Sequence, residues 1–487
     1  MDRSRTGALL ERLDAVTGNG IEAAVRAKHR ARLKRLGWEH ALEPDGSELW
    51  ARGEPPPRPG CALEVLIDGA AALPAIARAL AEAHEYVHIA GWHLAPYFAL
   101  ERRERQVVLG ELLAEVAERV PVRVLVWAGA PLPLFHPTRR EVSRAVQNLV
   151  RGTRIRCEVD PREHPFHCHH EKVVVVDGEV AFVGGIDLTD AAGDRFDCQS
   201  HPARRRLGWH DAAARITGPA VGDVDEHFAQ RWREVTGERL ERRGSQGATG
   251  DKTVQVVRTV AEGMYRSLPR GEFRILESYT RALRSAQRLI YLENQFLWSP
   301  EIVAILADKL RDPPHDDFRM VLLLPARANN GQDDTSGQLG VLSAADDGQR
   351  RLLAATIRSL SKERDDPLYV HAKVGLVDDR WLTIGSANLN AHSLMNDTEL
   401  NLVCQDPDLA RETRTRLWSE HLQLDAATIA ATDYRNLVDD HWRPVALEQL
   451  ERLRRGAPPA HRLLALPGVS RRSRRLLGPL TGLVEDA

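Results

Sequence analysis

The sequence predicts an α/β protein of two pseudo-symmetric lobes, each a mixed sheet flanked by helices, with the functional site at the interface between the lobes. Short apolar runs alternate with helical patterns along most of the chain, which is typical of a sheet covered by helices. The order of these runs is repeated in the second half, which indicates an ancient duplication. With 487 residues, the chain is long enough for one large duplicated core.

The first half contains the elements expected of one lobe. Residues 1–50 read as helical, and the run ARGEPPPRPG that follows them marks a boundary near residue 59. Beyond this boundary we expect a strand at 63–68, a helix at 73–84, and strands at 86–89 and 122–127.

The second half begins near residue 254 and repeats this order. There we expect a helix at 278–287, a strand at 289–295, a helix at 301–310, and strands at 318–325 and 368–378. A polar, glycine-bearing stretch between the halves reads as a linker. The expected boundaries are an N-terminal helical extension at 1–59, a first lobe at 60–240, the linker at 241–253, a second lobe at 254–425, and a C-terminal helical and basic extension at 426–487.

Two copies of an H-x-K-x-x-x-x-D motif are the strongest functional signal in the chain. The first copy consists of His170, Lys172 and Asp177, and the second of His371, Lys373 and Asp378. Each aspartate is followed seven residues later by a glycine. Of the 67 basic residues only seven are lysines, so chance is a poor explanation for two such motifs.

A carboxylate follows each motif at the start of an apolar strand. Asp211 opens one of these strands and Glu399 opens the other. The histidines are 201 positions apart and the carboxylates 188, so the first half carries about 13 extra residues, which fall in the polar stretch 191–206.

These residue types suit the cleavage of a phosphodiester without a metal ion. In a strand, residues two apart point to one face, so each histidine would project beside its lysine. Two lysines would neutralise the phosphate and stabilise the charge on its oxygens. A neutral imidazole can attack phosphorus, and a protonated one can release the leaving alkoxide. Asp211 and Glu399 are placed to fix the histidine tautomers.

The paired motifs resemble those of the phospholipase D superfamily, and flanking segments are similar to the eukaryotic-type phospholipase D group. The resemblance spans about residues 60–425. The flanking segments are IAGWHL at 89–94, GGIDLTD at 184–190, GWHD at 208–211, HFAQRW at 227–232 and IYLENQF at 290–296.

This resemblance implies roles for individual residues. It makes His170 the nucleophile and His371 the acid and base, although the sequence symmetry alone permits the reverse. It places Lys172, Lys373 and Asn388 on the phosphate, and Asp211 and Glu399 behind the histidines. The motif aspartates Asp177 and Asp378 are expected to be structural. Gly185 and Asp187 stand where the second repeat has Ser386 and Asn388, and all four are expected to line the substrate site.

The bulk composition narrows the class of protein. The net charge of −2 gives no sign of a general nucleic-acid-binding face, so no nucleic-acid partner is expected. The five cysteines are widely spaced and no signal peptide is evident, which favours a reducing, cytoplasmic location. Uncharged runs are too short to span a bilayer, so the protein would meet lipid from the surface, at the inner face of the membrane.

Three further features of the sequence can be explained either by a function or by a purely structural role. The histidines and cysteine in HPFHCHHEK, His164 to His170, could bind a metal, but their spacing is irregular for zinc and a polar loop is favoured. His93 and the run Glu293 to Gln295 lie at strand ends, where they either contact substrate or hold the lobe interface. The arginines at 471, 472, 474 and 475 lie in a segment that could dock on anionic lipid or stay solvated.

We expect hydrolysis of the head-group-side phosphodiester of a glycerophospholipid such as phosphatidylcholine, giving phosphatidic acid. Water or an alcohol would be the acceptor, and no cofactor is expected. The alternatives are a phosphatidyltransferase resembling cardiolipin synthase and, less favoured because of the near-neutral charge, a nuclease. A non-enzymatic lipid-binding protein is disfavoured because every motif residue is present. The oligomeric state is left open.

Overall fold

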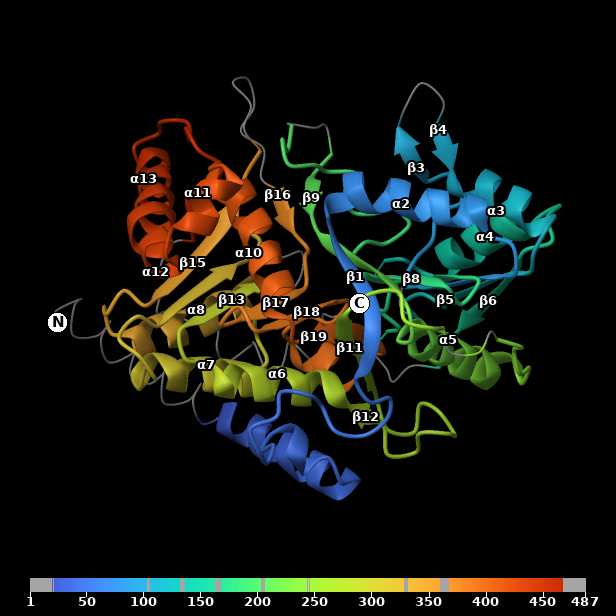
Figure 1. Ribbon diagram of the computed structural model, residues 1–487, viewed down its shortest axis with the longest axis horizontal. Coiled ribbons are helices and arrows are strands. Elements are labelled where there is room, and N and C mark those ends of the chain that lie inside the picture. Colours follow the sequence, from blue (N-terminus) through green and yellow to red (C-terminus); the bar gives the residue numbers. More distant parts are fainter. Residues whose placement is uncertain are drawn as a thin grey trace, which may run out of the picture.

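The two lobes share one continuous sheet (Figure 1), seen in a computed structural model. The structure describes residues 20, 22–102, 106–131, 136–162, 168–202, 206–242, 244, 246–327, 332–359 and 368–466. Two central strands, β1 (Arg58–Ile67) and β11 (Lys252–Val260), pair antiparallel and join the lobes. A register shift between Arg58 and Cys61 interrupts this pairing.

The strand order on the two sides of this junction is the same. Moving outward from β1, the strands are β10 (Ala212–Thr217), β8 (Val180–Gly184), β7 (Val173–Val176), β2 (Val87–Gly91), β5 (Val122–Trp127) and β6 (Arg156–Asp160). Moving outward from β11, they are β19 (Glu399–Cys404), β18 (Trp381–Gly385), β17 (Val374–Val377), β13 (Leu289–Glu293), β14 (Arg319–Leu323) and β15 (Leu352–Ile357), followed by β20 (Leu463–Ala465).

Both lobes have mixed sheets, as the sequence predicted. In the first lobe β2, β5 and β6 run parallel, and in the second β13, β14 and β15 do, whereas the strands nearer the junction are antiparallel. The remaining short strands are β3 (Ala99–Arg102), β4 (Gln106–Val108), β9 (Gly208–His210), β12 (Glu272–Phe273) and β16 (Leu368–Val370).

Helices cover both faces of the sheet (Figure 1). The first lobe has α2 (Asp68–Glu82), α3 (Leu109–Ala117), α4 (Arg139–Val150) and α5 (Val221–Thr236). The second has α6 (Arg274–Ser285), α7 (Pro300–Arg311), α8 (Gln332–Asp346), α9 (Ala391–Met395) and α10 (Pro407–Leu422). Before the sheet, residues 22–36 are helical and a 3₁₀ turn follows at Glu39–Ala41.

The segment after residue 425 belongs structurally to the second lobe. Its helices are α11 (Ala426–Ala431), α12 (Tyr434–Asn436), a π-helical turn at Leu437–Trp442 and α13 (Arg443–Arg454). β20 then adds to the sheet edge by pairing with β15. The predicted lobe boundaries stay a prediction, and the arginines at 471–475 lie outside the described residues.

One predicted strand is wrong in its extent. Residues 368–378 were expected to form a single strand, but β16 ends at Val370 and β17 begins at Val374. The three residues between them leave the sheet because their backbone bonds to the other lobe instead. The first motif also lies outside its strand, because β7 begins only after Lys172. The histidine and lysine of each motif therefore lie at a strand entrance and not within the strand.

The motif aspartates hold tight turns together. Asp177 and Asp378 both adopt left-handed backbone conformations, with φ values of 57° and 53°. The Asp177 carboxylate accepts hydrogen bonds from the backbone N–H groups of residues 84–86, at 2.7 to 3.1 Å. Asp378 does the same for residues 287–289, at 2.7 to 2.8 Å. Each aspartate thereby ties a strand turn to the segment that enters the neighbouring strand.

Replacing Asp177 with alanine should lower the free energy of unfolding by about 2–3 kcal/mol, because three backbone donors lose their acceptor. Asp378→Ala should cost less, because Asp378 is only partly buried. Asp177→Asn retains an acceptor and tolerates the left-handed backbone, so it is the matched control. Urea denaturation of the three variants measures this, and equal stability of Asp177→Ala and the parent would contradict the assignment.

Candidate active site

Each motif histidine is paired with a carboxylate from the opposite lobe. His170 of the first lobe lies with Nδ1 3.0 Å from Oε1 of Glu399, which begins β19 in the second lobe. His371 of the second lobe lies with Nδ1 2.6 Å from Oδ2 of Asp211, which lies between β9 and β10. Both carboxylates are buried, so each fixes its imidazole with Nδ1 as the proton donor and leaves Nε2 free for chemistry.

Backbone hydrogen bonds enforce this crossed arrangement. The N–H of His170 donates to the carbonyl of Thr398 at 2.9 Å, and the N–H of His371 donates to the carbonyl of His210 at 2.8 Å. Thr398 and His210 directly precede the two carboxylates in sequence. The segment that leaves the sheet at each motif is thus held against the residue before its partner carboxylate.

The two lysines lie beside their histidines but in different electrostatic surroundings. Each ammonium donates to the carbonyl of its own motif histidine, at 2.6 Å for Lys172 and 2.5 Å for Lys373. Lys172 also lies 3.4 Å from the Asp187 carboxylate, whereas Lys373 donates to the neutral amide of Gln295 at 3.1 Å. The positive charge of Lys373 is therefore less well neutralised by its direct contacts than the positive charge of Lys172.

Two of the predicted substrate-lining positions contact the carboxylates. A side-chain carbon at Gly185 would come within 2.1 Å of Oδ1 of Asp211, so the glycine makes room for that carboxylate. The equivalent Ser386 donates its hydroxyl to Oε2 of Glu399. Gly185 and Ser386 therefore help to hold the carboxylate partners of the histidines in place, and their expected place in the lining of the substrate site stays a prediction.

The other two predicted positions each have one buried side-chain oxygen without a hydrogen-bond partner among the described residues. These atoms are Oδ1 of Asp187 and Oδ1 of Asn388. The Asn388 amide nitrogen lies 3.4 Å from the Gln295 side-chain oxygen, which also binds Lys373. Asn388 is thereby linked to the second lysine through Gln295, whereas Asp187 contacts the first lysine directly.

Burial shifts the titration of the second motif and its partner. It lowers the pKa of Lys373 to about 7 and raises the pKa of Asp211 to about 6. Burial, together with the positive charges of Lys373 and Arg195, holds the pKa of His371 well below its ordinary value. His371 is therefore neutral at pH 7 in the free site.

Sequence reasoning missed two buried residues beside His371. The Trp209 ring lies with its centroid 4.1 Å from that of His371, and the guanidinium of Arg195 lies 3.0 Å from the Trp209 centroid. Nε and Nη1 of Arg195 have no hydrogen-bond partner among the described residues. Trp209 is part of the GWHD segment, but Arg195 lies in the 191–206 insertion, where nothing in the second repeat marks it.

The alternative candidates from the sequence mostly have structural partners. Nδ1 of His169 lies 2.8 Å from the Thr398 hydroxyl and its Nε2 lies 3.1 Å from the Asp160 carboxylate, so both ring nitrogens lie close to oxygen atoms of the protein. His164 and His167 of the same run lie outside the described residues. The Asn294 side chain accepts from the backbone N–H of Phe296 at 3.1 Å. Of the strand-end run, only Gln295 contacts a motif lysine among the described residues.

Comparison with known proteins finds matches to both halves of the chain. A family model described as phospholipase D matches residues 79–208, and one described as a cardiolipin synthase, phospholipase D-like domain matches residues 279–420. Phospholipase D alpha 4 of Arabidopsis thaliana is 25% identical over 480 residues, covering 71% of this chain and 62% of its own length. Phospholipase D1 of Schizosaccharomyces pombe is 24% identical, covering 78% of this chain and 36% of its own length.

The fold is also similar to that of a solved structure. Phosphatidylserine synthase of Haemophilus influenzae superposes with a TM-score of 0.53 at 13% identity, covering 76% of this chain and 86% of its own. The chain belongs to the phospholipase D superfamily. These likenesses support an enzyme of the phospholipase D type, although the chain spans only 62% and 36% of the two curated relatives described above. No helix among the described residues is long and apolar enough to cross a bilayer.

The buried charge of Lys373 gives a stability prediction with a definite sign. Because its folded pKa is about 7 and the unfolded value is 10.5, the unfolded chain binds more protons between these values. The parent should therefore gain stability relative to Lys373→Met as the pH rises from 7 toward 10. Denaturant unfolding of both proteins across this range measures the difference. A difference that is constant with pH would contradict the lowered pKa.

Proposed function

We propose that this chain is a phospholipase D-type enzyme that cleaves the head-group side of a glycerophospholipid through a phospho-histidine intermediate. The observation that carries the proposal is the pair of histidine–carboxylate dyads crossed between the lobes, with a buried lysine beside each histidine. Two imidazoles with free Nε2 atoms and two ammonium groups are the set that phosphodiester cleavage needs without a metal.

In the first step, Nε2 of one histidine attacks phosphorus and the bond from phosphorus to the head-group oxygen breaks. The second histidine, protonated at Nε2, gives its proton to the departing alkoxide. Lys172, Lys373 and the amide of Asn388 stabilise the added charge on the non-bridging oxygens. The products of this step are a free head group and a phosphatidyl group bound to nitrogen.

In the second step, the histidine that lost its proton removes one from a water molecule, whose oxygen attacks phosphorus. The phosphorus–nitrogen bond breaks, phosphatidic acid leaves, and both histidines return to their starting protonation states. An alcohol can replace water and gives a phosphatidyl-alcohol instead. The ratio of hydrolysis to transfer onto an alcohol depends on how well the site excludes water.

We assign His170 as the nucleophile and His371 as the acid and base, following the resemblance to the eukaryotic-type group. The His170 side chain is 15% exposed and that of His371 only 4%, which favours His170 for direct attack. The pKa of His371 is held low in the free site, so it needs the negative charge of the bound phosphate to acquire its proton. Substrate binding would thus load the acid that the first step requires.

A phosphatidyltransferase is the second candidate. It is favoured by the match of residues 279–420 to a cardiolipin synthase domain model. The two candidates share every step except the identity of the acceptor. In both, phospholipid at a membrane surface is the proposed substrate, which the enzyme would meet as a peripheral protein.

Incubation with phosphatidylcholine vesicles and ethanol should release choline and yield both phosphatidic acid and phosphatidylethanol. The phospho-histidine partitions between the two acceptors, so both products should appear with one common time course. Vesicles of phosphatidylglycerol without added alcohol test the second candidate through formation of cardiolipin. Absence of any product from all phospholipids would contradict the proposed function.

Replacing each histidine with asparagine assigns the two roles. His170→Asn should prevent labelling of the protein by substrate phosphorus, because the attacking nitrogen is lost. His371→Asn should accumulate label on His170 when the head group is a good leaving group, since release by water then lacks its base. Peptide mapping by mass spectrometry locates the label, and label on His371 in the His170→Asn protein would reverse the assignment.

Gly185→Ala should lower turnover by about 100-fold, because the added carbon displaces the Asp211 carboxylate from His371. Gly222→Ala, where nothing lies within 4 Å of the added carbon, is the control and should keep parental turnover. Initial rates on phosphatidylcholine measure the effect. Parental activity in Gly185→Ala would show that Asp211 does not need its observed position.

A further inference from the structure

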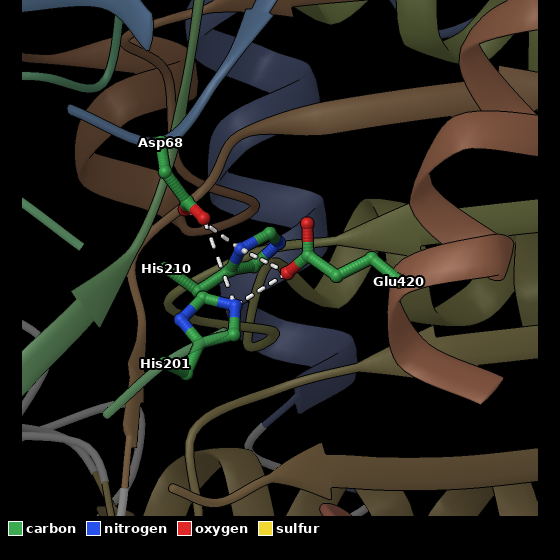
Figure 2. A group of neighbouring side chains, drawn as sticks. All are labelled: Asp68, His201, His210 and Glu420. Atoms are coloured by element: carbon green, nitrogen blue, oxygen red, sulfur yellow. Dashed lines mark hydrogen bonds and ion pairs between the residues drawn. The ribbon is translucent and has the colours of Figure 1, made fainter. Parts of the chain in front are cut away.

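Behind the site lies a group of buried charged residues that the proposed chemistry does not use directly. Asp68, His201, His210 and Glu420 converge from both lobes (Figure 2). None of the four side chains is more than 7% exposed. Asp68 begins α2 in the first lobe, whereas Glu420 lies in α10 of the second.

The His210 ring is bound on both sides by carboxylates. Its Nδ1 lies 2.9 Å from Oδ1 of Asp68, and its Nε2 lies 3.0 Å from Oε2 of Glu293. Carboxylates at such sites accept hydrogen bonds, so both ring nitrogens must donate. Glu293 also accepts from the Tyr291 hydroxyl and from His421 Nε2, the latter at 2.8 Å. Although burial opposes it, the charge of His210 holds the pKa of Glu293 well below its ordinary value. The ring is therefore an imidazolium held between two anions from different lobes.

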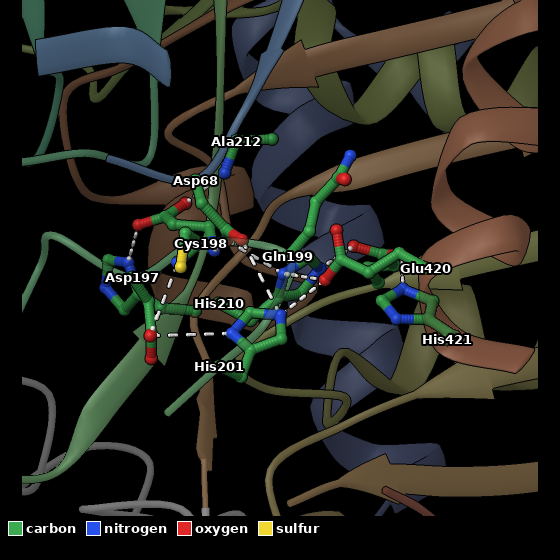
Figure 3. Close-up of polar contacts among 12 residues, drawn as sticks. Asp68, Asp197, Cys198, Gln199, His201, His210, Ala212, Glu420 and His421 are labelled. Carbon is green, nitrogen blue, oxygen red and sulfur yellow. Dashed lines mark hydrogen bonds and ion pairs between the residues drawn. The ribbon is translucent and has the colours of Figure 1, made fainter. Parts of the chain in front are cut away.

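The same residue types could bind a metal ion, but the distances between their side-chain atoms fit direct hydrogen bonds better than metal coordination. Ligand atoms on a tetrahedral zinc ion lie about 3.3 Å apart, as bonds of roughly 2.0 Å require. The His210–Asp68 contact is a hydrogen bond of 2.9 Å, and His201 Nε2 bonds directly to Glu420. Although burial opposes it, the neighbouring carboxylates of Asp197 and Glu420 raise the pKa of His201 to about 9. Figure 3 shows His201 between Asp197 and Glu420.

His210 and Asp68 are connected directly to the second histidine dyad. Asp68 Oδ1 accepts from the backbone N–H of Asp211 at 3.0 Å, and the N–H of Asp68 donates to the carbonyl of Asp211 at 2.8 Å. The carbonyl of His210 accepts from His371 N, as described above. One clamp thus holds both the carboxylate and the imidazole of this dyad.

We propose that Asp68 and Glu293 clamp His210 as an imidazolium and that this clamp positions Asp211 against His371. Asp68, His210 and Glu293 are then positioning residues for the proposed phosphodiester chemistry, on which the proposal rests. The first dyad lacks an equivalent histidine. The residue before Glu399 is Thr398, where the second dyad has His210 before Asp211, and the Thr398 hydroxyl is hydrogen-bonded to His169. The clamp is specific to the histidine that we assign as acid and base.

The charges around the clamp support this role. Although burial opposes it, Asp68 and Glu293 raise the pKa of His210 well above its ordinary value. The other titratable groups facing His210 are His201, His421 and Glu420. Asp211 in turn faces Lys373, Arg195 and His210, whose positive charges lower its pKa against the effect of burial. Loss of the imidazolium charge should therefore raise the pKa of Asp211 above about 6.

Asp68→Asn tests the clamp by removing one anion while keeping its shape. The matched control is Asp225→Asn, because Asp225 is also a buried carboxylate bound to a histidine, with Oδ1 2.7 Å from Nδ1 of His88. Both variants should lower the melting temperature by similar amounts. Only Asp68→Asn should lower kcat on phosphatidylcholine, by about 100-fold with little change in KM. It alone should also shift the acidic limb of the kcat–pH profile to higher pH.

Orthovanadate binding by isothermal titration provides a readout that does not depend on turnover. The affinity of Asp68→Asn for orthovanadate should fall, and that of Asp225→Asn should stay at the parental value. If the parent cleaves no phospholipid, the proposed function fails while this comparison still tests the clamp. If Asp68→Asn does not fold, Glu293→Gln removes the other anion and should give the same changes.

Two results would overturn the proposal. One is an equal loss of kcat or orthovanadate affinity in Asp68→Asn and Asp225→Asn, or no loss in either. The other is one equivalent of zinc or another divalent metal per chain, found by elemental analysis of the purified parent and absent from Asp68→Asn. That second result would make the cluster a metal site.

Discussion

The crossing of the two histidine–carboxylate pairs is the constraint on which the rest of the site depends. His170 needs Glu399 from the second lobe, and His371 needs Asp211 from the first. Neither half of the chain can therefore form a complete dyad by itself. The antiparallel pairing of β1 with β11 makes the sheet continuous and fixes how the lobes face each other. The short segments that leave the sheet at each motif then reach across to the opposite lobe.

The pseudo-symmetry of the fold does not extend to the electrostatics. Asp187 offsets the charge of Lys172, whereas Asn388 and Gln295 leave Lys373 without a carboxylate partner of its own motif. Burial adds to this difference by lowering the pKa of Lys373 to about 7. A duplicated fold can thus give two chemically distinct histidines, as a reaction with one nucleophile and one acid requires. The insertion at 191–206 contributes to the asymmetry through Arg195.

Much of this arrangement is predictable from the sequence, because apolar runs and a shared offset report local structure and duplication. The two-lobed α/β fold follows from those patterns, whereas the superfamily follows from the resemblance of the paired H-x-K-x-x-x-x-D motifs. The crossing of the dyads does not follow, because Asp211 and Glu399 have the same spacing from a motif whether they pair within a lobe or across lobes. The break in the 368–378 strand is also invisible to residue periodicity, since its cause is a backbone hydrogen bond to His210. The ionic clamp behind Asp211 joins residues as far apart as 68 and 293, which no local pattern connects.

The central claim is that two motifs from two lobes form one reaction centre. A phosphatidyl ester of 4-nitrophenol tests it directly, because its leaving group needs little acid assistance and makes the second step rate-limiting. Rapid mixing with excess ester should release a burst of one nitrophenolate per chain, followed by slow turnover. A burst of two per chain would contradict the account, because each motif would then act as a separate site.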